Sequence, residues 1–325
     1  MMRARITGTG SYAPERVMTN ADIERMVATS DEWIRERTGI RERRVVADGQ
    51  ACSDLALIAA ERALKAAGVS ASELDLIVLA TCTGDTPLPS TACLLQHRLG
   101  ASRAAAFDLA AACCGFVYAL GVADAYVRTG MRHVLVVGSE VMSAITDWTD
   151  RNTCVLFGDG AGAAVVSASG DERGILSTHL HSDGSMCDLI TVPGGGTRIP
   201  PSDKMVNDRL QYIKMKGNET FKVAVRTLEE VARETLAAHG VCVNDVDLYV
   251  PHQANVRIIK AVVDRLGLPL EKVVLNMDRY GNTSAASIPI ALDEAVRDGR
   301  VRDGQLIMLG AFGAGLTWAS ALIRW

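Results

Sequence analysis

Short apolar runs alternate with amphipathic segments along the chain. Runs such as LDLIVLA at 74–80 and VDLYVPH at 246–252 are mostly apolar and short, which is typical of strands buried in a central sheet. The segment before the first run has helical periodicity and ends at Gly68, a residue suited to a left-handed helix cap. Helices that alternate with buried strands predict a layered α/β architecture. The predicted helices lie at about 54–67, 114–129, 219–239 and 284–298, and the predicted strands at 74–80, 134–138, 246–252 and 306–310.

The order of these elements repeats along the chain. Identities at one constant offset link LKAAGVSASELDLIVLA, which ends at Ala80, with LAAHGVCVNDVDLYVPH, which ends at His252. The chain is therefore predicted to contain two copies of one α/β unit, with a cleft between them where chemistry is expected. The predicted halves are 1–171 and 172–325. The segment 182–201, which contains PGGG, has no clear period and is predicted to be an exposed loop.

Composition excludes several classes of protein. The net charge of −4 over 325 residues argues against a nucleic-acid binder. No run approaches about 18 uninterrupted apolar residues, and the N-terminus lacks the apolar stretch of a signal peptide, so no membrane association and a cytoplasmic location are expected. The eight cysteines show no Cys-x2-Cys pairing, so most are predicted to pack in the core, and no metal site is expected.

Three residues could carry chemistry, although each has a structural alternative. Cys113 lies in AFDLAAACCGF at the start of a predicted helix, where the helix dipole would lower the pKa of the thiol; otherwise it is a buried core cysteine. His252 ends a predicted strand, where sites form in α/β sheets, or it is a core histidine. Asn282 lies in RYGNTSAAS just before a helix, where it could also serve as a helix cap or a turn amide.

Two glycine segments need separate interpretations. FGDGAGAA at 157–164 partly resembles a dinucleotide-binding loop, but a strand-like run follows it instead of a helix, which argues against NAD binding. FGAGLTW at 312–318 is predicted to be a tight turn that presents backbone N–H groups.

Taken together, these motifs resemble a known family. AFDLAAACCGF, PHQANVRII, YGNTSAASIP, FGDGAGAA, FGAGLTW and TSDEWIRERTGIRER resemble β-ketoacyl-acyl carrier protein synthase III, the condensing enzyme that initiates type II fatty acid synthesis. The resemblance runs from about Ile6 to Trp325. It implies a thiolase fold, layered α-β-α-β-α and built from two duplicated halves, a homodimer, and no metal or redox cofactor. Acyl-CoA and malonyl-acyl carrier protein would be substrates.

The resemblance also implies roles for the candidate residues. Cys113 would accept an acyl group from a short acyl-CoA starter. His252 and Asn282 would donate hydrogen bonds to the enolate formed when malonyl-acyl carrier protein loses carbon dioxide. The backbone N–H groups of Cys113 and Ala314 would form the oxyanion hole, although the family commonly has glycine where this chain has Ala314.

Other positions match the family less specifically. Each has an ordinary alternative as a packed aromatic, a solvated charge or an interface side chain. Leu88, where the family often has phenylalanine, matches a residue that closes the acyl pocket of the partner subunit, and its size leads us to expect short starters. The implied assignments are coenzyme A binding for Trp33, Arg37 and Arg151, carrier-protein docking for Lys222 and Arg257, and the acyl pocket for Leu88, Phe221 and Phe312.

The closest alternative function is that of a paralogous acyl-CoA condensing or acyltransfer enzyme of secondary metabolism that uses the same Cys-His-Asn site. A hydroxymethylglutaryl-CoA synthase fits less well, because PHQAN and GNTSAAS together suit decarboxylation of a malonyl unit. A non-catalytic partner subunit would have no reason to keep Cys113, His252 and Asn282 together.

Overall fold

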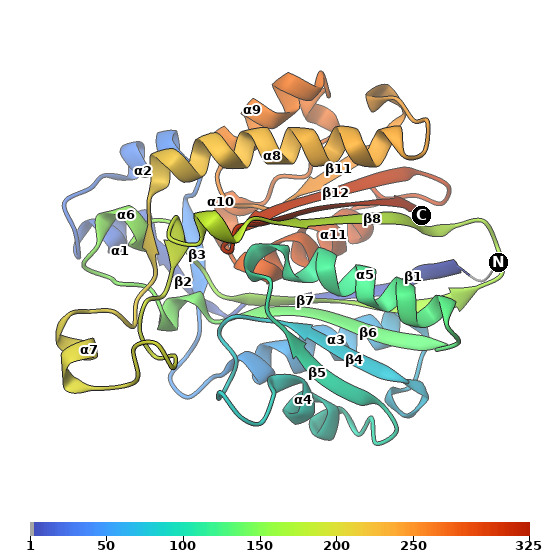
Figure 1. The fold of residues 1–325 in the computed structure, drawn as a ribbon, viewed down its shortest axis with the longest axis horizontal. Coiled ribbons are helices and arrows are strands. Elements are labelled where there is room, and N and C mark those ends of the chain that lie inside the picture. Colours follow the sequence, from blue (N-terminus) through green and yellow to red (C-terminus); the bar gives the residue numbers. More distant parts are fainter. Residues whose placement is uncertain (1–2) are drawn as a thin grey trace.

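Two β-sheets form the centre of the molecule in the computed structural model, which describes residues 3–325 (Figure 1). In the first sheet the strand order is β1-β7-β6-β4-β5. Strand β4 pairs in parallel with β5 and β6, whereas β7 pairs antiparallel with β6 and β1. The strands are β1 (Arg3–Tyr12), β4 (Leu76–Ala80), β5 (Ala105–Leu109), β6 (His133–Glu140) and β7 (Gly160–Ser169).

The second sheet repeats this pattern without an equivalent of β5. Its order is β11-β12-β13-β8, with β11 and β12 parallel and the other pairs antiparallel. This order and these directions match β4-β6-β7-β1 in the first sheet. The boundary predicted at 171/172 falls between β7 and β8 and stays a prediction. The strands are β8 (Gly174–Ser182), β11 (Leu248–Pro251), β12 (Leu306–Gly313) and β13 (Thr317–Arg324).

Helices separate and cover the two sheets, which gives five layers (Figure 1). Helices α5 and α11 lie between the sheets and share one core with both of them. Helices α3 and α4 pack on the outer face of the first sheet, and α8 and α9 on the outer face of the second. The predicted α-β-α-β-α thiolase architecture is confirmed. The helices are α3 (Cys52–Ala67), α4 (Thr91–Leu99), α5 (Gly115–Arg128), α8 (Gly217–Ala237), α9 (Val256–Leu266) and α11 (Ser287–Arg297).

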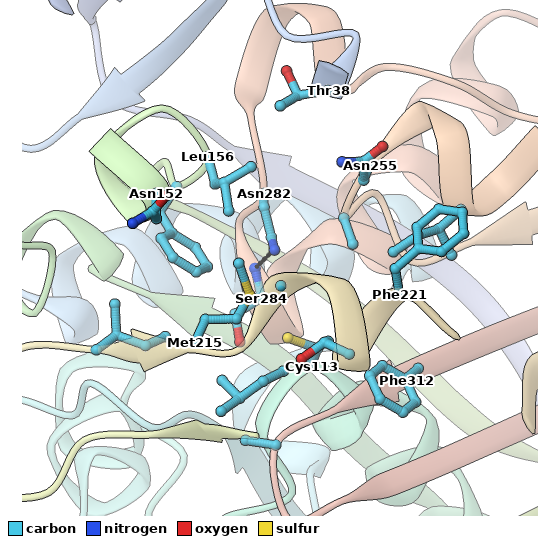
Figure 2. A pocket seen from close by; sticks show the side chains of 18 of the residues that line it. Thr38, Cys113, Asn152, Leu156, Met215, Phe221, Asn255, Asn282, Ser284 and Phe312 are labelled. Carbon is cyan, nitrogen blue, oxygen red and sulfur yellow. Dashed lines mark hydrogen bonds between the residues drawn. The ribbon is translucent and has the colours of Figure 1, made fainter. Parts of the chain in front are cut away.

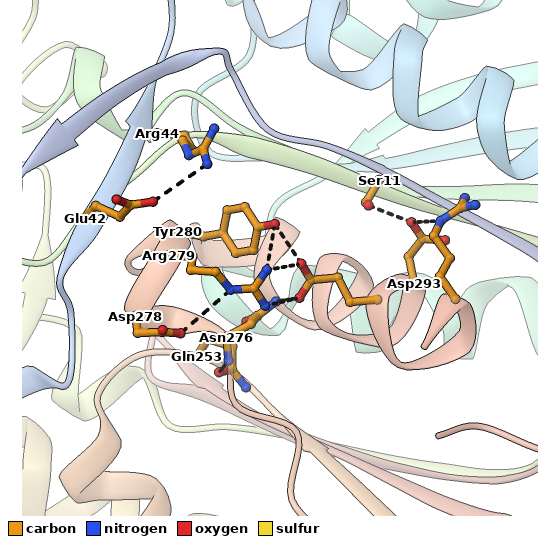
Figure 3. A network of polar contacts seen from close by, with 11 residues as sticks. Ser11, Glu42, Arg44, Gln253, Asn276, Asp278, Arg279, Tyr280 and Asp293 are labelled. Carbon is orange, nitrogen blue, oxygen red and sulfur yellow. Dashed lines mark hydrogen bonds and ion pairs between the residues drawn. The ribbon is translucent and has the colours of Figure 1, made fainter. Parts of the chain in front are cut away.

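The burial of α11 explains how the central layer is fixed. Eight of the eleven residues of its sequence SIPIALDEAVR are buried, as expected of a helix enclosed between two sheets. Its Asp293 is buried too, and its carboxylate accepts hydrogen bonds from Thr9 Oγ1 (2.8 Å) and Ser11 Oγ (2.6 Å) of β1 (Figure 3). A buried carboxylate that accepts these hydrogen bonds costs little free energy, and the two bonds fix α11 against the first sheet.

Several short elements, among them α1, α2, α6, α7, β2 and β3, lie toward one end of the molecule (Figure 1), and others are placed nearer its centre. The expected loop at 182–201 is mostly irregular, but it contains a two-residue strand, β9, that pairs with β10. The predicted helix at 284–298 begins as a 3-10 turn, η7, before α11. These elements are β2 (Arg16–Thr19), α1 (Asn20–Glu24), α2 (Asp31–Thr38), β3 (Glu42–Val45), α6 (Arg151–Cys154), β9 (Ile190–Thr191), α7 (Asp203–Asn207), β10 (Lys214–Met215), α10 (Met277–Tyr280) and η7 (Ser284–Ala286).

Two features are absent from the part of the chain that the structure describes. None of the helices within 3–325 combines the length and the apolar character needed to cross a bilayer. Over the same range, no cluster of three or more histidine, cysteine, aspartate or glutamate side chains is arranged to hold a metal ion.

Candidate active site

A cavity of about 1060 Å³ lies where the two halves meet, and Cys113, His252 and Asn282 all line it. Figure 2 shows Cys113 and Asn282 at this cavity. Each residue comes from a different segment: the turn before α5, the end of β11 and the loop after α10. The strand ends of both halves therefore converge on one site, as is usual for α/β sheets. The structure brings together the three residues that sequence motifs singled out.

The backbone around Cys113 sets the direction of its side chain. Cys113 lies in a 3-10 turn, η2 (Ala112–Cys114), and α5 begins two residues later at Gly115. Ala112 has a φ of 46°, an uncommon conformation for a residue other than glycine, and such conformations cluster at functional sites. Cys114 is fully buried, and its thiol donates a hydrogen bond to the carbonyl of Thr317 (3.3 Å). Only Cys113 of the pair lines the cavity.

The thiol of Cys113 differs from the sequence-based expectation. Its side chain opens on the cavity, but protein atoms surround it on the other sides, and burial raises its pKa to about 12. The neighbouring Ser284 hydroxyl acts in the opposite direction, and the nearby Glu140 raises the pKa further. The pKa of Cys113 is therefore raised and not lowered as expected from the dipole of α5, because burial disfavours the charged thiolate.

His252 is held as a neutral imidazole. Burial lowers its pKa to about 3, and its Nδ1 lies 2.6 Å from Ser287 Oγ. Ser287 Oγ also accepts a hydrogen bond from the backbone N–H of Gln253 (3.4 Å), so its own proton is available for Nδ1. An Nδ1 that accepts this proton leaves the hydrogen of the neutral ring on Nε2. In that tautomer His252 offers a hydrogen-bond donor at Nε2.

The amide of Asn282 is oriented by its neighbours. The backbone N–H of Ser284 donates to Asn282 Oδ1 (2.9 Å), which leaves Nδ2 as the donor not used by this bond. The Asn282 backbone is bound on both sides, since its N–H donates to the carbonyl of Leu156 (2.9 Å) and its carbonyl accepts from Gly158 (3.1 Å).

A polar network also holds the segment that precedes Asn282 (Figure 3). Glu294 of α11 accepts hydrogen bonds from Tyr280 Oη (2.7 Å), Asn276 Nδ2 (2.8 Å) and the Arg279 guanidinium (2.9 Å). Several charge-assisted bonds to one carboxylate constrain a segment more than an isolated surface pair does. The network therefore fastens α10 to α11 directly before the site.

The turn between β12 and β13 approaches the cysteine closely. A Cβ atom placed on Gly313 would lie 2.7 Å from the Cys113 backbone nitrogen, which is closer than packing allows. The next residue, Ala314, lines the cavity beside Cys113. A side chain at 313 would push these segments apart, so the turn needs glycine there. The oxyanion-hole role of the Cys113 and Ala314 N–H groups stays a prediction.

Trp33, Arg37 and Arg151 meet near the cavity. The Arg151 guanidinium lies 4.0 Å from the centre of the Trp33 ring, and that of Arg37 lies 5.9 Å from it. Trp33 and Arg37 line the cavity. A planar base in contact with both faces needs about 7 Å between Trp33 and Arg151. The two side chains therefore stack directly on each other, and the space between them is too narrow for a planar base.

The remaining predicted residues fall into two groups. Lys222, Arg257, Phe221 and Phe312 line the cavity, and Arg257 lies over the Phe221 ring at 5.7 Å (Figure 2). Leu88 does not line the cavity of its own chain; it is 85% exposed. An apolar side chain so exposed is available to a second subunit.

Sequence reasoning missed two polar residues behind Cys113. Ser284 lies in the quoted motif GNTSAAS, but nothing in its spacing distinguishes it from the other small residues there. Glu140 ends β6 in the run VLVVGSE, where a charged residue after a strand is normally solvent-exposed. In the structure both side chains are buried, and Ser284 Oγ donates to Glu140 Oε1 (3.0 Å).

A five-layer thiolase fold with a cysteine, a neutral histidine and an oriented amide around one cavity defines the class of acyl-transferring condensing enzymes. Comparisons with known proteins identify the family. Residues 107–184 match the family model for 3-oxoacyl-[acyl-carrier-protein] synthase III, and residues 236–325 match the model for its C-terminal part.

Full-length relatives agree with these matches. A β-ketoacyl-[acyl-carrier-protein] synthase III from Alkalilimnicola ehrlichii is 60% identical over 328 residues and covers 100% of both chains. One from Xanthomonas campestris pv. campestris is 58% identical and covers 99% of this chain and 98% of its own. The crystal structure of 3-oxoacyl-[acyl-carrier-protein] synthase III from Aquifex aeolicus VF5 has a TM-score of 0.92 at 50% identity, over 99% of this chain and 100% of its own. The chain belongs to the β-ketoacyl-[acyl-carrier-protein] synthase III family, and it is an acyltransferase.

Proposed function

We propose that this enzyme condenses a short acyl-CoA with malonyl-acyl carrier protein, releases carbon dioxide, and gives the 3-ketoacyl-acyl carrier protein that initiates fatty acid synthesis. The observation that carries the proposal is the convergence of Cys113, His252 and Asn282 on one cavity. A carbon–carbon condensation needs an electrophile held covalently and a carbanion generated beside it, and these side chains supply both requirements.

In the first half-reaction, the Cys113 thiolate attacks the thioester carbonyl of the acyl-CoA. The tetrahedral oxyanion receives hydrogen bonds from the backbone N–H groups of Cys113 and Ala314, and coenzyme A leaves as its thiolate. The close packing of Gly313 on Cys113 supports this assignment, because it keeps the two N–H groups near each other.

In the second half-reaction, malonyl-acyl carrier protein loses carbon dioxide. The electron pair of the broken bond forms an enolate whose charge lies on the thioester oxygen. His252 Nε2–H and Asn282 Nδ2–H donate to that oxygen, in keeping with the hydrogen bonds that fix Nδ1 and Oδ1. The enolate carbon then attacks the acyl-Cys113 carbonyl, and the cysteine leaves as a thiolate.

The surroundings of the cavity suit these substrates. Trp33, Arg37 and Arg151 would hold the adenine and phosphates of coenzyme A, and the exposed cations Lys222 and Arg257 would dock the acidic carrier protein. Phe221 and Phe312 would line the path of the acyl chain. We infer a homodimer in which Leu88 closes the partner's acyl pocket. No cofactor takes part in this scheme.

Mass spectrometry of the intact protein tests the proposal. The protein is incubated with a panel of acyl-CoAs, and malonyl-acyl carrier protein is then added. We expect an acyl adduct with short chains, which disappears with formation of 3-ketoacyl-carrier protein; Cys113→Ala should form no adduct. An absent adduct with every acyl-CoA, or an adduct that malonyl-carrier protein does not discharge, contradicts the proposal.

The secondary-metabolism alternative is not favoured. The similar proteins with 54–60% identity over almost the whole chain carry the name β-ketoacyl-[acyl-carrier-protein] synthase III. Product analysis in the same experiment separates the two, because a paralogue of that kind would accept a different starter or a non-malonyl acceptor.

A further inference from the structure

Arg43 is a fully buried cation outside the catalytic cavity. It is the last residue of the motif TSDEWIRERTGIRER, of which the proposed function uses only Trp33 and Arg37. Alternate side chains of β3 face the interior, which places Arg43 inside the protein and its neighbour Arg44 nearer the surface. Arg43 is 0% exposed and does not line the cavity. It therefore touches no substrate there, and any part in the reaction must act through other residues.

Neutral oxygen atoms bind the guanidinium of Arg43. Nη2 donates to the carbonyl of Val155 (2.8 Å), and Nη1 donates to Asn20 Oδ1 (2.9 Å) and to the carbonyl of Met18 (3.3 Å). Within residues 3–325, no carboxylate lies within ion-pair distance of it. Burial lowers its pKa to about 10, which still leaves it protonated near neutral pH. A charge buried without a counter-ion costs stability, so this arrangement points to a role in placing the groups that the guanidinium binds.

The carbonyl of Val155 begins the segment that holds Asn282. The Asn282 backbone N–H donates to the carbonyl of Leu156 (2.9 Å), and its carbonyl accepts from the N–H of Gly158 (3.1 Å). These bonds form a short parallel β-bridge between the two segments. Arg43 therefore binds the first residue of a segment whose next residues fix the backbone of Asn282.

The aliphatic part of Arg43 packs against both sides of this bridge. A Cβ atom placed on Gly158 would lie 2.9 Å from Arg43 Cβ, and one placed on Gly281 would lie 3.2 Å from it. Gly281 has a φ of 66° and directly precedes Asn282. The stem of Arg43 thus supports both segments of the bridge, while its head binds one of them. The Asn282 side chain extends from this bridge to the cavity (Figure 2).

We propose that Arg43 is a positioning residue for the decarboxylation step. It holds residues 155–158 and Gly281 where the bridge places Asn282 Nδ2–H on the enolate oxygen. Without the guanidinium, the carbonyl of Val155 is released and the bridge can shift. A donor in an oxyanion-type site stabilises the transition state only when it is held in place, so the shift reduces its effect. The inference rests on the proposed role of Asn282.

The first test compares the two half-reactions in Arg43→Met. A misplacement near 1 Å can cost about 10²-fold in rate, and we expect release of carbon dioxide from malonyl-acyl carrier protein to fall by about tenfold or more. Acylation of Cys113 does not use the amide of Asn282, so it should fall by less than about threefold. Arg43→Lys keeps the charge but lacks the planar fork that binds Val155 and Asn20 together, and its decarboxylation should fall similarly.

A double-mutant cycle tests whether Arg43 acts through Asn282. When the amide is already absent in Asn282→Ala, adding Arg43→Met should lower decarboxylation by less than about twofold further. A residue that supports the fold in general would instead lower the rate by the same factor in both backgrounds. The non-additive loss is therefore the signature of positioning.

Arg300→Met is the matched control. Arg300 also donates to two backbone carbonyls, those of Glu271 (3.2 Å) and Val273 (3.0 Å), but it does not line the cavity. Its variant should lose stability in thermal unfolding and keep the rates of both half-reactions. Hydrogen exchange gives a readout without activity: peptides that cover residues 155–158 and 281–284 should exchange faster in Arg43→Met and not in Arg300→Met.

Three results would overturn the proposal: unchanged decarboxylation in Arg43→Met, an equal loss of acylation, or the same factor of loss in both backgrounds. If Arg43→Met and Arg43→Lys do not fold, Asn20→Ala takes the cycle. It removes one acceptor of the guanidinium, and its smaller loss should also vanish in the Asn282→Ala background. Failure of the proposed function is distinct, since the natural protein would then release no carbon dioxide from malonyl-acyl carrier protein.

Discussion

Cys113 and Cys114 are neighbours in the chain but have different surroundings. Cys113 borders the cavity, whereas the thiol of Cys114 is bonded to the carbonyl of Thr317 in the core. Peptide mapping after incubation with an acyl-CoA should therefore find the acyl group on Cys113. Cys114→Ser keeps a donor for Thr317 and should acylate normally, whereas Cys113→Ala should not acylate. A label on Cys114 alone would show that the nucleophile is misassigned.

His252 and Asn282 should matter more for decarboxylation than for acyl transfer. Their donors are assigned to the enolate oxygen, so we expect His252→Ala and Asn282→Ala each to lower malonyl decarboxylation by roughly 10²–10³-fold. Transfer of the acyl group to Cys113 should fall by less than about tenfold. Separate assays of carbon dioxide release and acyl-enzyme formation measure the two effects, with the exposed His97→Ala as a control. Normal decarboxylation with failed acylation would reverse the assigned roles.

The pKa of His252 adds a pH dependence to this prediction. A histidine near its ordinary pKa of about 6.5 gains a proton as the pH falls through that value. Because burial lowers the pKa of His252 to about 3, its ring stays neutral from about pH 5 to 8. Decarboxylation should therefore show no histidine titration in this range. A loss of activity centred near pH 6.5 that is absent from the His252→Ala background would contradict a neutral imidazole.

For single residues, the sequence identified the chemical types of the candidate catalytic side chains but did not predict their protonation states. Motifs marked Cys113, His252 and Asn282, because a nucleophile and two donors near glycine or small residues form a recognisable pattern. The raised pKa of Cys113 and the burial of Glu140 depend on how much protein surrounds each group. The depth of burial depends on residues that are far apart in the chain, such as Thr83 and Ser284, and no local sequence pattern encodes it.

The turn between β12 and β13 belongs to the C-terminal half of the chain, and it packs against Cys113, which belongs to the N-terminal half. Because a Cβ on Gly313 would meet the Cys113 nitrogen at 2.7 Å, Gly313→Ala should displace the Cys113 backbone. A misplacement near 1 Å typically costs about 10²-fold in rate, and we expect acylation of Cys113 to fall by roughly that factor. The rate of acyl-enzyme formation measures it.

Gly196→Ala is the control for this change. A Cβ at that position meets nothing within 4 Å, so the substitution should leave acylation unchanged. Circular dichroism would verify that both variants fold. Equal acylation rates in the two variants would show that the contact between Gly313 and Cys113 does not matter for the reaction.

Long elements were predictable and short ones were not. The helix expected at 54–67 corresponds to α3, and the strands expected at 134–138 and 306–310 lie within the buried strands β6 and β12. Each has enough residues to show a period. Strand β9 has two residues and depends on pairing with β10, so the segment 182–201 could only be interpreted as a loop.

The exposed Leu88 makes a prediction about the assembled molecule. If Leu88 closes the partner's acyl pocket, the protein should sediment as a dimer and prefer acetyl- or isobutyryl-CoA to decanoyl-CoA. Each methylene that does not fit changes discrimination by about 1–3 kcal/mol, so the longest chain should be almost excluded. Leu88→Thr should relax this ranking in kcat/KM, whereas Leu270→Thr, at a second exposed leucine, should not.

Two results would contradict this arrangement. A natural preference for decanoyl-CoA would refute the short-starter prediction. An unchanged ranking in Leu88→Thr, with the dimer intact, would show that another residue limits chain length.

The stack of Arg151 on Trp33 also bears on the time that coenzyme A stays bound. Contacts of this kind contribute about 0.5–2 kcal/mol, and a nucleotide that enters between the two side chains must break this one. If the adenine of coenzyme A binds between these side chains as proposed, the arginine would return to the indole when the coenzyme departs and recover that free energy. The stack would then act as an internal competitor that shortens the residence time of the spent coenzyme.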